Sequence, residues 1–462
     1  MNLSELSSKR VHFIGMGGAG MSGIARIMLA RGISVSGSDA KDSAVLNGLE
    51  ILGAKVFVGH DSENLGLSEI LVVSSAISED NPEYVGAKSR GLLILTRAEA
   101  LSLLMSESKS VAIAGTHGKT TTTSMLTVAL QQGGLDPSFA IGGMINRGGT
   151  NAHLGSGEMF IAEADESDGS FLVYKPFGAI ITNIELDHVD NFPDMASVNR
   201  IFAQFVASIQ PGGFLIAGVD SPGVVQLLST IDRSDIEIIT YGESGDIVIS
   251  HMSLQPKSSH ARVTDSGKVV GELSLGIPGA HNIENATAAL AAGLKLGIAP
   301  SALLAGLATF SGAKRRFENR GSVNGITVID DYGHHPTEVK VTLETAKRFA
   351  GQGKVIVIFQ PHRYSRTAMF VSEFADALSI ADQVYLLEVY AANEAPIAGI
   401  SSVLIASAMG SADVEFEPSM IDAINSAASM AKTGDVIMTL GAGDVNLLVP
   451  LILQMLEEKI EN

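Results

Sequence analysis

The chain has 462 residues, with 50 acidic against 31 basic side chains, a formal net charge of −19 and no cysteine. This length indicates two to four domains of about 100–200 residues each, and the lack of cysteine excludes disulfide scaffolds, iron–sulfur clusters and thiol nucleophiles. The negative charge argues against nucleic acid as a partner, and no leader or spanning segment stands out, so we expect a cytoplasmic protein without membrane insertion.

The first predicted elements are a buried strand at 11–14, a glycine-rich turn and a helix that runs to about Ala30. The turn reads Gly15-Met16-Gly17-Gly18-Ala19-Gly20, and Asp39 follows the next strand. This is the dinucleotide-binding fingerprint, in which glycines let a pyrophosphate approach the backbone and an acidic side chain meets a ribose hydroxyl. The pattern specifies a pyrophosphate and a sugar but not the attached group, so NAD and a UDP-sugar satisfy it equally.

A second strand, at 111–114, leads into Gly115-Thr116-His117-Gly118-Lys119-Thr120 and a helix that runs to about Gln132. Converging backbone N–H groups and a helix N-terminus favour phosphate here, Lys119 suits the β- and γ-phosphates, and the Thr120 hydroxyl suits Mg²⁺. The loop has two residues between its glycines, where the standard triphosphate-binding loop has four. We predict nucleotide binding; the alternative is a glycine-rich turn with an exposed lysine.

Two acidic clusters follow the next strands. Residues 163–168 come after a strand at 159–162, and residues 183–190, which include His188, come after a strand at 179–182. Both clusters lie at the carboxyl ends of strands, where α/β proteins build their sites. One or two carboxylates with substrate phosphates are typical of Mg²⁺, so we predict a metal site; solvated strand ends are the alternative.

The last part of the chain continues the strand–helix alternation. We expect strands at 326–329, 355–359, 383–387 and 436–440, the last followed by a third glycine-rich turn at 441–444 and an apolar helix. Residues 235–275 differ, because their β-like segments have little helix between them, and we predict an antiparallel insert there. We expect boundaries between domains near 100–110 and 312–322. The whole pattern indicates an α/β architecture.

Together these motifs resemble the Mur ligase family, in the branch that adds alanine. The segments that carry the resemblance span nearly the whole chain: residues 12–23, 36–39, 115–121, 163–168, 183–190, 279–286, 314–318, 330–338, 360–367 and 440–444. The runs His334-His335-Pro336-Thr337-Glu338 and Pro361-His362-Arg363-Tyr364-Ser365-Arg366-Thr367 are specific to this branch and its close relatives.

The resemblance implies an α/β fold of three domains: a Rossmann-like UDP-sugar-binding domain at 1–106, a central P-loop ATPase-type domain at 107–318, and a Rossmann-like amino-acid-binding domain at 319–462. The implied activity is ATP-dependent ligation of L-alanine to the lactyl carboxylate of UDP-N-acetylmuramate, through an acyl phosphate, in peptidoglycan precursor synthesis. ATP and Mg²⁺ are the implied cofactors, and UDP-N-acetylmuramate and L-alanine are the implied substrates.

The resemblance also implies site residues. The UDP-sugar would bind Gly15, Gly17, Gly18, Ala19, Gly20, Ser38 and Asp39. ATP would bind Gly115, Thr116, His117, Gly118, Lys119, Thr120, Thr121, His281, Asn282, Asn285 and Asp331, and metal would bind Thr120, Glu163 and His188. The amino acid would bind Tyr332, His334, Arg363 and Arg366. Catalysis would fall to Lys119, His188, Arg316 and His334, with His334 as a candidate general base.

Local alternatives stand beside these roles. Asn282 also suits a helix N-terminal cap, and Arg363 and Arg366 also suit a solvated pair on a helix face. The chain departs from the family pattern twice: residues 198–202 contain no lysine, so the carbamoylated lysine of other members is expected to be absent, and Ala391 stands where relatives carry proline.

Three other functions compete with this one. A recycling ligase adds a whole tripeptide to the same UDP-sugar, and Tyr332-Gly333 disfavours it. A nicotinamide-dependent oxidoreductase rests on the first loop alone and leaves Lys119 unexplained. A nucleotide-switched interaction protein would need the two loops but not the histidine and arginine motifs of the last third.

Overall fold

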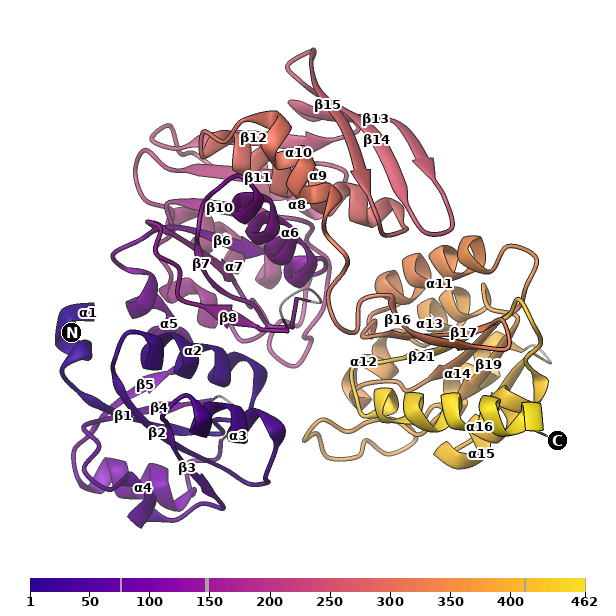
Figure 1. The fold of residues 1–462 in the computed structure, drawn as a ribbon, viewed down its shortest axis with the longest axis horizontal. Coiled ribbons are helices and arrows are strands. Elements are labelled where there is room, and N and C mark those ends of the chain that lie inside the picture. Colours follow the sequence, from indigo (N-terminus) through magenta and orange to yellow (C-terminus); the bar gives the residue numbers. More distant parts are fainter. Residues whose placement is uncertain (75–76, 146–148, 411–412, 462) are drawn as a thin grey trace.

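The computed structural model describes residues 1–74, 77–145, 149–410 and 413–461, and these form three sheets that follow one another along the chain (Figure 1). Helices cover the sheets, so the predicted α/β class is confirmed. Among the described residues, no helix is both long and apolar enough to cross a membrane.

The first sheet is parallel, with strand order β3-β2-β1-β4-β5. Its strands are β1 (Arg10–Ile14), β2 (Ser34–Asp39), β3 (Lys55–Val58), β4 (Ile70–Val73) and β5 (Leu93–Thr96), and its helices are α1 (Leu3–Ser7), α2 (Ala19–Ala30), α3 (Ala44–Ile51), α4 (Pro82–Ser89) and α5 (Arg97–Met105). Strands β2 and β3 are added on one side of β1, and β4 and β5 on the other. The position between β1 and β4 is therefore the topological switch point, where α/β proteins bind ligands. The turn at 15–20 leaves β1 there.

The second sheet has ten strands in the order β15-β14-β13-β12-β11-β10-β6-β9-β7-β8. These are β6 (Lys109–Ala114), β7 (Ser138–Ala140), β8 (Ala152–His153), β9 (Met159–Glu163), β10 (Gly178–Ile181), β11 (Phe214–Gly218), β12 (Glu237–Gly242), β13 (Ile247–Leu254), β14 (Ser259–Asp265) and β15 (Lys268–Leu275). The helices are α6 (Lys119–Gln132), α7 (Met195–Ala207), α8 (Pro222–Leu228), α9 (Ala280–Lys295) and α10 (Pro300–Ala308). Val111 and Ile113 of β6 pack with α6, α9 and α10, whereas Ala112 and Ala114 join the core under α7.

The insert predicted at 235–275 is only partly right. β13, β14 and β15 are antiparallel to one another, but β12 is parallel to β11 and begins a parallel pairing with β13. These four strands therefore extend the central sheet at one edge instead of forming a separate layer.

The third sheet has the order β16-β17-β21-β18-β19-β20, with only β16 antiparallel to its neighbour. Its strands are β16 (Glu318–Val323), β17 (Ile326–Asp331), β18 (Val355–Phe359), β19 (Gln383–Leu386), β20 (Val414–Phe416) and β21 (Val436–Leu440). Its helices are α11 (Pro336–Ala350), α12 (Tyr364–Met369), α13 (Val371–Leu378), α14 (Val403–Met409), α15 (Met420–Met430) and α16 (Val449–Glu461). The four strands predicted here are confirmed.

Candidate active site

The loop predicted to bind phosphate, called the phosphate loop below, joins β6 to α6 and requires glycine at positions 115 and 118. Gly115 has φ +133° and Gly118, which precedes the first residue of α6, has φ +82°. A Cβ atom at Gly115 would overlap the Thr182 hydroxyl, and one at Gly118 would overlap the Asn285 amide oxygen. Glycine at these two positions therefore allows the loop to pack closely against Thr182, just after β10, and against Asn285 of α9.

Lys119 folds back over this loop. Its ammonium group donates to the carbonyl oxygens of Gly115 at 2.7 Å and Thr116 at 3.1 Å, and to Oε1 of Glu166 at 2.8 Å. Glu166 is buried, and burial raises the pKa of its carboxyl to about 7 against the opposing charge of Lys119. A phosphate at this loop would find Lys119 within the site, but paired with Glu166.

The Thr120 hydroxyl and the Glu163 carboxylate meet at the end of β9. Thr120 Oγ1 donates to Glu163 Oε1 at 3.0 Å, and the Gly142 amide donates to the other carboxylate oxygen at 2.8 Å. These are two hard oxygen donors at the head of the phosphate loop, the donor chemistry that Mg²⁺ prefers.

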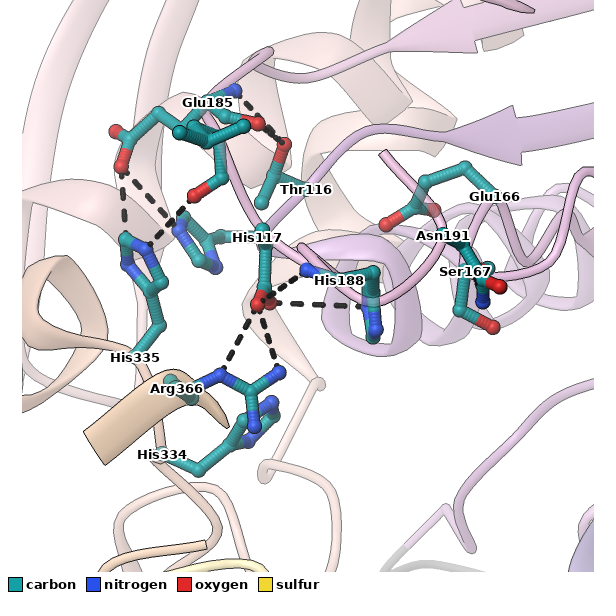
Figure 2. Close-up of polar contacts among 12 residues, drawn as sticks. Thr116, His117, Glu166, Ser167, Glu185, His188, Asn191, His334, His335 and Arg366 are labelled. Carbon is teal, nitrogen blue, oxygen red and sulfur yellow. Dashed lines mark hydrogen bonds and ion pairs between the residues drawn. The ribbon is translucent and has the colours of Figure 1, made fainter. Parts of the chain in front are cut away.

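The loop after β10 carries His188, which has a left-handed backbone with φ +50°. Burial lowers the pKa of its imidazole, so the ring is neutral at pH 7 and able to bind a metal. Its backbone amide donates to Asp187 Oδ1 at 2.7 Å, and Figure 2 shows the His188 ring between the phosphate loop and the loop that carries Glu166.

His117 links the phosphate loop to the C-terminal domain (Figure 2). Its Nδ1 lies 3.3 Å from Glu338 Oε1 and its Nε2 lies 3.5 Å from Glu185 Oε2. Burial opposes protonation, but the two carboxylates raise the pKa of His117 to about 9. The imidazolium therefore adds a second positive charge next to the loop.

His117, Glu185 and His335 form a compact cluster whose ligand atoms lie within 4.8 Å of one another. Each member already has protein partners. His335 uses both ring nitrogens, on the Thr337 amide and on the Leu186 carbonyl, at 3.3 Å each. The cluster ties the central domain to α11.

A cavity of about 600 Å³ opens between the central and C-terminal domains. Seven of the predicted ATP residues line it, together with Arg316: His117, Gly118, Thr121, His281, Asn282, Asn285 and Asp331. This volume lies in the usual range of about 300–1,000 Å³ for small-molecule pockets. The lining does not include Gly115, Thr116, Lys119 or Thr120, and the Thr116 hydroxyl is hydrogen-bonded to the backbone of Glu185.

Asn282 is not the helix cap that the alternative interpretation required. α9 begins at Ala280 after Gly279, so Asn282 lies inside the first turn, where its amide donates to the Pro278 carbonyl at 2.7 Å. Gly279 is the N-cap residue of α9, and its φ of +107° is a backbone conformation that glycine adopts without strain. Next to it, burial and the charge of Arg316 lower the pKa of His281 to about 4.

The Asp331 carboxylate is used in hydrogen bonds to the protein's own backbone. It accepts hydrogen bonds from the amides of Phe317 and Gly333, both at 2.7 Å. These bonds hold the turn that presents Arg316, whose guanidinium lies 3.6 Å from Glu338. Burial raises the pKa of Asp331 to about 6.

The four predicted amino-acid residues lie at the interface between the two domains. Arg366 is 3% exposed and donates from Nε (3.0 Å) and Nη2 (2.7 Å) to Asp187 Oδ1, so it is not part of a solvated pair. Arg363 donates to Asp190 at 2.5 Å. Tyr332 and His334 have ring centroids 5.3 Å apart, and burial lowers the pKa of His334 to about 3. His334 is therefore neutral and a weak proton acceptor at neutral pH.

The glycine-rich turn after β1 is tied to the end of β2. The amides of Gly15 and Met16 both donate to the Ser38 carbonyl at 2.9 Å, and the Gly17 amide donates to Asp39 at 2.9 Å. The Ser38 hydroxyl points away from the turn and donates to the buried Glu83 at 2.5 Å. Gly18 precedes α2, and Ala19 and Gly20 form its first turn. The residues predicted to bind the UDP-sugar therefore lie close together. Ser38 contacts the turn through its backbone carbonyl, and its hydroxyl is bonded to Glu83.

Four carboxylates of the site had no individual role in the sequence prediction, although three of them belong to the two acidic clusters: Glu166, Glu185, Asp187 and Glu338. All four lie inside the quoted motifs, so the local signal was present. Their partners come from other segments, as with Arg366 and Asp187, which are separated by 179 residues. That pairing is not visible in the order of residues.

The fold and this loop define an α/β protein of three domains, with a P-loop-type turn between β6 and α6 of the central one. Three family models match successive parts of the chain: "Mur ligase family, catalytic domain" at 10–109, "Mur ligase middle domain" at 113–293 and "Mur ligase, glutamate ligase domain" at 315–443. The chain belongs to the Mur ligase family.

Named relatives are similar over nearly the whole length. The chain is 48% identical to a UDP-N-acetylmuramate–L-alanine ligase of Acidothermus cellulolyticus, covering 97% of this chain and 95% of the relative. It is 47% identical to the ligase of the same name in Saccharopolyspora erythraea, covering 98% and 94%. None of these matches supports the oxidoreductase alternative.

Solved structures of ligases of this family are also similar to the chain. The UDP-N-acetylmuramate-alanine ligase of Thermotoga maritima superposes with a TM-score of 0.82 at 28% identity, covering 98% of this chain and all of that one. A murein peptide ligase of Psychrobacter arcticus has a TM-score of 0.73 at 26% identity, covering 97% and 98%.

Proposed function

We propose that this protein is the ATP-dependent ligase that joins L-alanine to the lactyl carboxylate of UDP-N-acetylmuramate in peptidoglycan precursor synthesis. The observation that carries the proposal is the meeting of Lys119, the Thr120–Glu163 pair and the loop of His188 at one edge of the central sheet, facing the C-terminal domain. The 48% identity to an alanine ligase over 97% of the chain supports it.

The reaction needs an activated carboxylate, because a carboxylate is a poor electrophile. ATP would first phosphorylate it to an acyl phosphate, which the amine then attacks with release of phosphate. Two anions must approach each other, so catalysis is mainly positioning and charge neutralisation. Lys119, Arg316 and the His117 imidazolium are the cations placed to do this.

Mg²⁺ fits the donors of this site. Thr120 and Glu163 supply neighbouring hard oxygens at 3.0 Å, and His188 supplies a neutral imidazole for a second ion. A bound ion would offset phosphate charge. The Gly142 amide and the Thr120 hydroxyl fix the orientation of the Glu163 carboxylate through hydrogen bonds to its two oxygens.

The substrates would occupy separate parts of the molecule. Adenosine would lie in the 600 Å³ cavity against His281, Asn282, Asn285 and Asp331, and the UDP group on the turn at 15–20 in domain 1–106. Alanine would lie near Tyr332, His334, Arg363 and Arg366 in domain 319–462. Because both arginines are paired with carboxylates of the central domain, the alanine carboxylate would compete for them. We place the protein in the cytoplasm.

A turnover assay with an amine panel tests the proposal. We expect phosphate release from ATP only when Mg²⁺, UDP-N-acetylmuramate and L-alanine are all present, with no turnover when the recycling tripeptide replaces alanine. Turnover with the tripeptide and none with alanine would overturn the proposal in favour of a recycling ligase.

A further inference from the structure

Glu166 has one carboxylate oxygen without a use in the protein. The residue is 4% exposed, its Oε1 accepts from Lys119 at 2.8 Å, and its Oε2 is buried with no hydrogen-bond partner among the described residues. A buried polar atom that lacks a partner destabilises the fold, because its lost hydration is not replaced by a hydrogen bond. Such an oxygen is a place for a donor that arrives with a ligand.

The neighbours of Glu166 are already engaged. Asp165 lies 3.3 Å from Arg97 and accepts from the Ser167 amide at 3.1 Å. The Ser167 carbonyl accepts from Asn191 at 2.9 Å, which fixes this loop to the loop of His188 (Figure 2). The loop is therefore held in place, and Glu166 is the buried acidic residue of this loop whose second oxygen has no partner among the described residues.

The position of Glu166 is close to the proposed chemistry. Lys119 reaches both the phosphate loop and Glu166, so the carboxylate stands one side chain away from where the phosphoryl group would be transferred. If Lys119 turned to a bound phosphate, Glu166 would lose the ion pair it makes at 2.8 Å and could accept another cation. The amine substrate arrives as such a cation, an ammonium group that cannot attack until it loses a proton.

We propose that Glu166 binds the ammonium group of the amine substrate through its free oxygen and accepts the proton that the amine must lose before attack. This inference rests on the proposed ligase function. The raised pKa of Glu166, about 7 because of burial, suits a proton acceptor that works near neutral pH, whereas the pKa of His334, lowered to about 3, does not.

The step balances. One ammonium proton moves to Glu166, and the freed nitrogen lone pair forms the C–N bond at the acyl carbon. The C–O bond to phosphate breaks and its electron pair leaves with the phosphate, which takes the second nitrogen proton. The third stays as the amide N–H, and Glu166 later returns its proton to solvent.

The test compares two nucleophiles in the Glu166→Gln variant. Hydroxylamine is uncharged near neutral pH and needs no proton acceptor before it attacks an acyl phosphate, so it forms a hydroxamate without Glu166. We expect kcat with alanine to fall about 100-fold or more, while hydroxamate formation at saturating UDP-sugar and ATP stays within a few-fold of wild type. Equal loss with both nucleophiles, or unchanged alanine turnover, would overturn the inference.

Two further variants keep the test decisive. Glu158→Gln makes the same substitution at an exposed position just before β9, and it should match wild type with both nucleophiles. Should Glu166→Gln unfold at a lower temperature than wild type, Glu166→Asp is compared instead, with a selective loss of alanine turnover expected again. A wild-type protein inactive with alanine would overturn the proposed function itself, which separates the two failures.

Discussion

Replacing Arg366 by methionine tests whether a buried ion pair joins the C-terminal domain to the central domain. The Arg366 side chain is 4% exposed and that of Asp187 is 6% exposed, and they are 2.7 Å apart. Burial would raise the pKa of Asp187, but the charge of Arg366 holds it well below its usual range. Removing one partner leaves the other charge buried and uncompensated, which typically costs about 3–5 kcal/mol. We expect Arg366→Met to lower the free energy of unfolding by about that amount.

The measurement is a double-mutant cycle by denaturant unfolding at pH 7. Methionine retains most of the apolar stem of arginine, so the change acts mainly on charge. The double variant Asp187→Asn/Arg366→Met removes both charges, and we expect it to recover most of the loss because neither charge is left unpaired.

An exposed pair provides the matched control. Arg262 and Glu272 are 2.7 Å apart with side chains 44% and 61% exposed, so Arg262→Met should change stability by no more than about 1 kcal/mol. If Arg366→Met is no more harmful than Arg262→Met, the reasoning about this interface is refuted.

Three further predictions address the site. Lys119→Ala should retain UDP-sugar binding by calorimetry but lose phosphate release, because the two sites lie on different sheets; loss of UDP-sugar binding would contradict this. The pKa of His117 is raised from 6.5 to about 9. The stability that its imidazolium adds to the folded protein is therefore fully present below pH 6.5 and is lost as the pH rises through 9. Wild type should lose roughly 3 kcal/mol more than His117→Asn over this window, and parallel curves of unfolding free energy against pH would count against the contact. Gly118→Ala should lower the melting temperature and weaken ATP binding, since the φ of +82° strains a Cβ and Asn285 blocks it; unchanged values of both would show that the loop adapts.

Local signals carried the prediction of the elements around the site. The strand predicted at 111–114 is the end of β6, and the helix predicted to end near Gln132 is α6 (Lys119–Gln132). A buried strand followed by a glycine-rich turn is encoded in a short stretch of consecutive residues, so it can be recognised from the sequence. The same holds for the turn after β1.

Contacts between distant segments were not predictable in this way. β12 pairs in parallel with β11, although its own residues only indicated a strand. The Glu166 carboxylate could be recognised as part of an acidic cluster, but its partnership with Lys119 spans 47 residues. Pairing and burial of this kind depend on how the chain folds back, which residue order alone does not specify.

The most direct test of the account follows an oxygen atom from substrate to product. With UDP-N-acetylmuramate labelled with ¹⁸O in its lactyl carboxylate, the enzyme is allowed to turn over with ATP, Mg²⁺ and L-alanine, and the released phosphate is examined by mass spectrometry. An acyl phosphate intermediate predicts one labelled oxygen in each phosphate released. Phosphate without label, alongside formation of the alanyl product, would contradict the central claim.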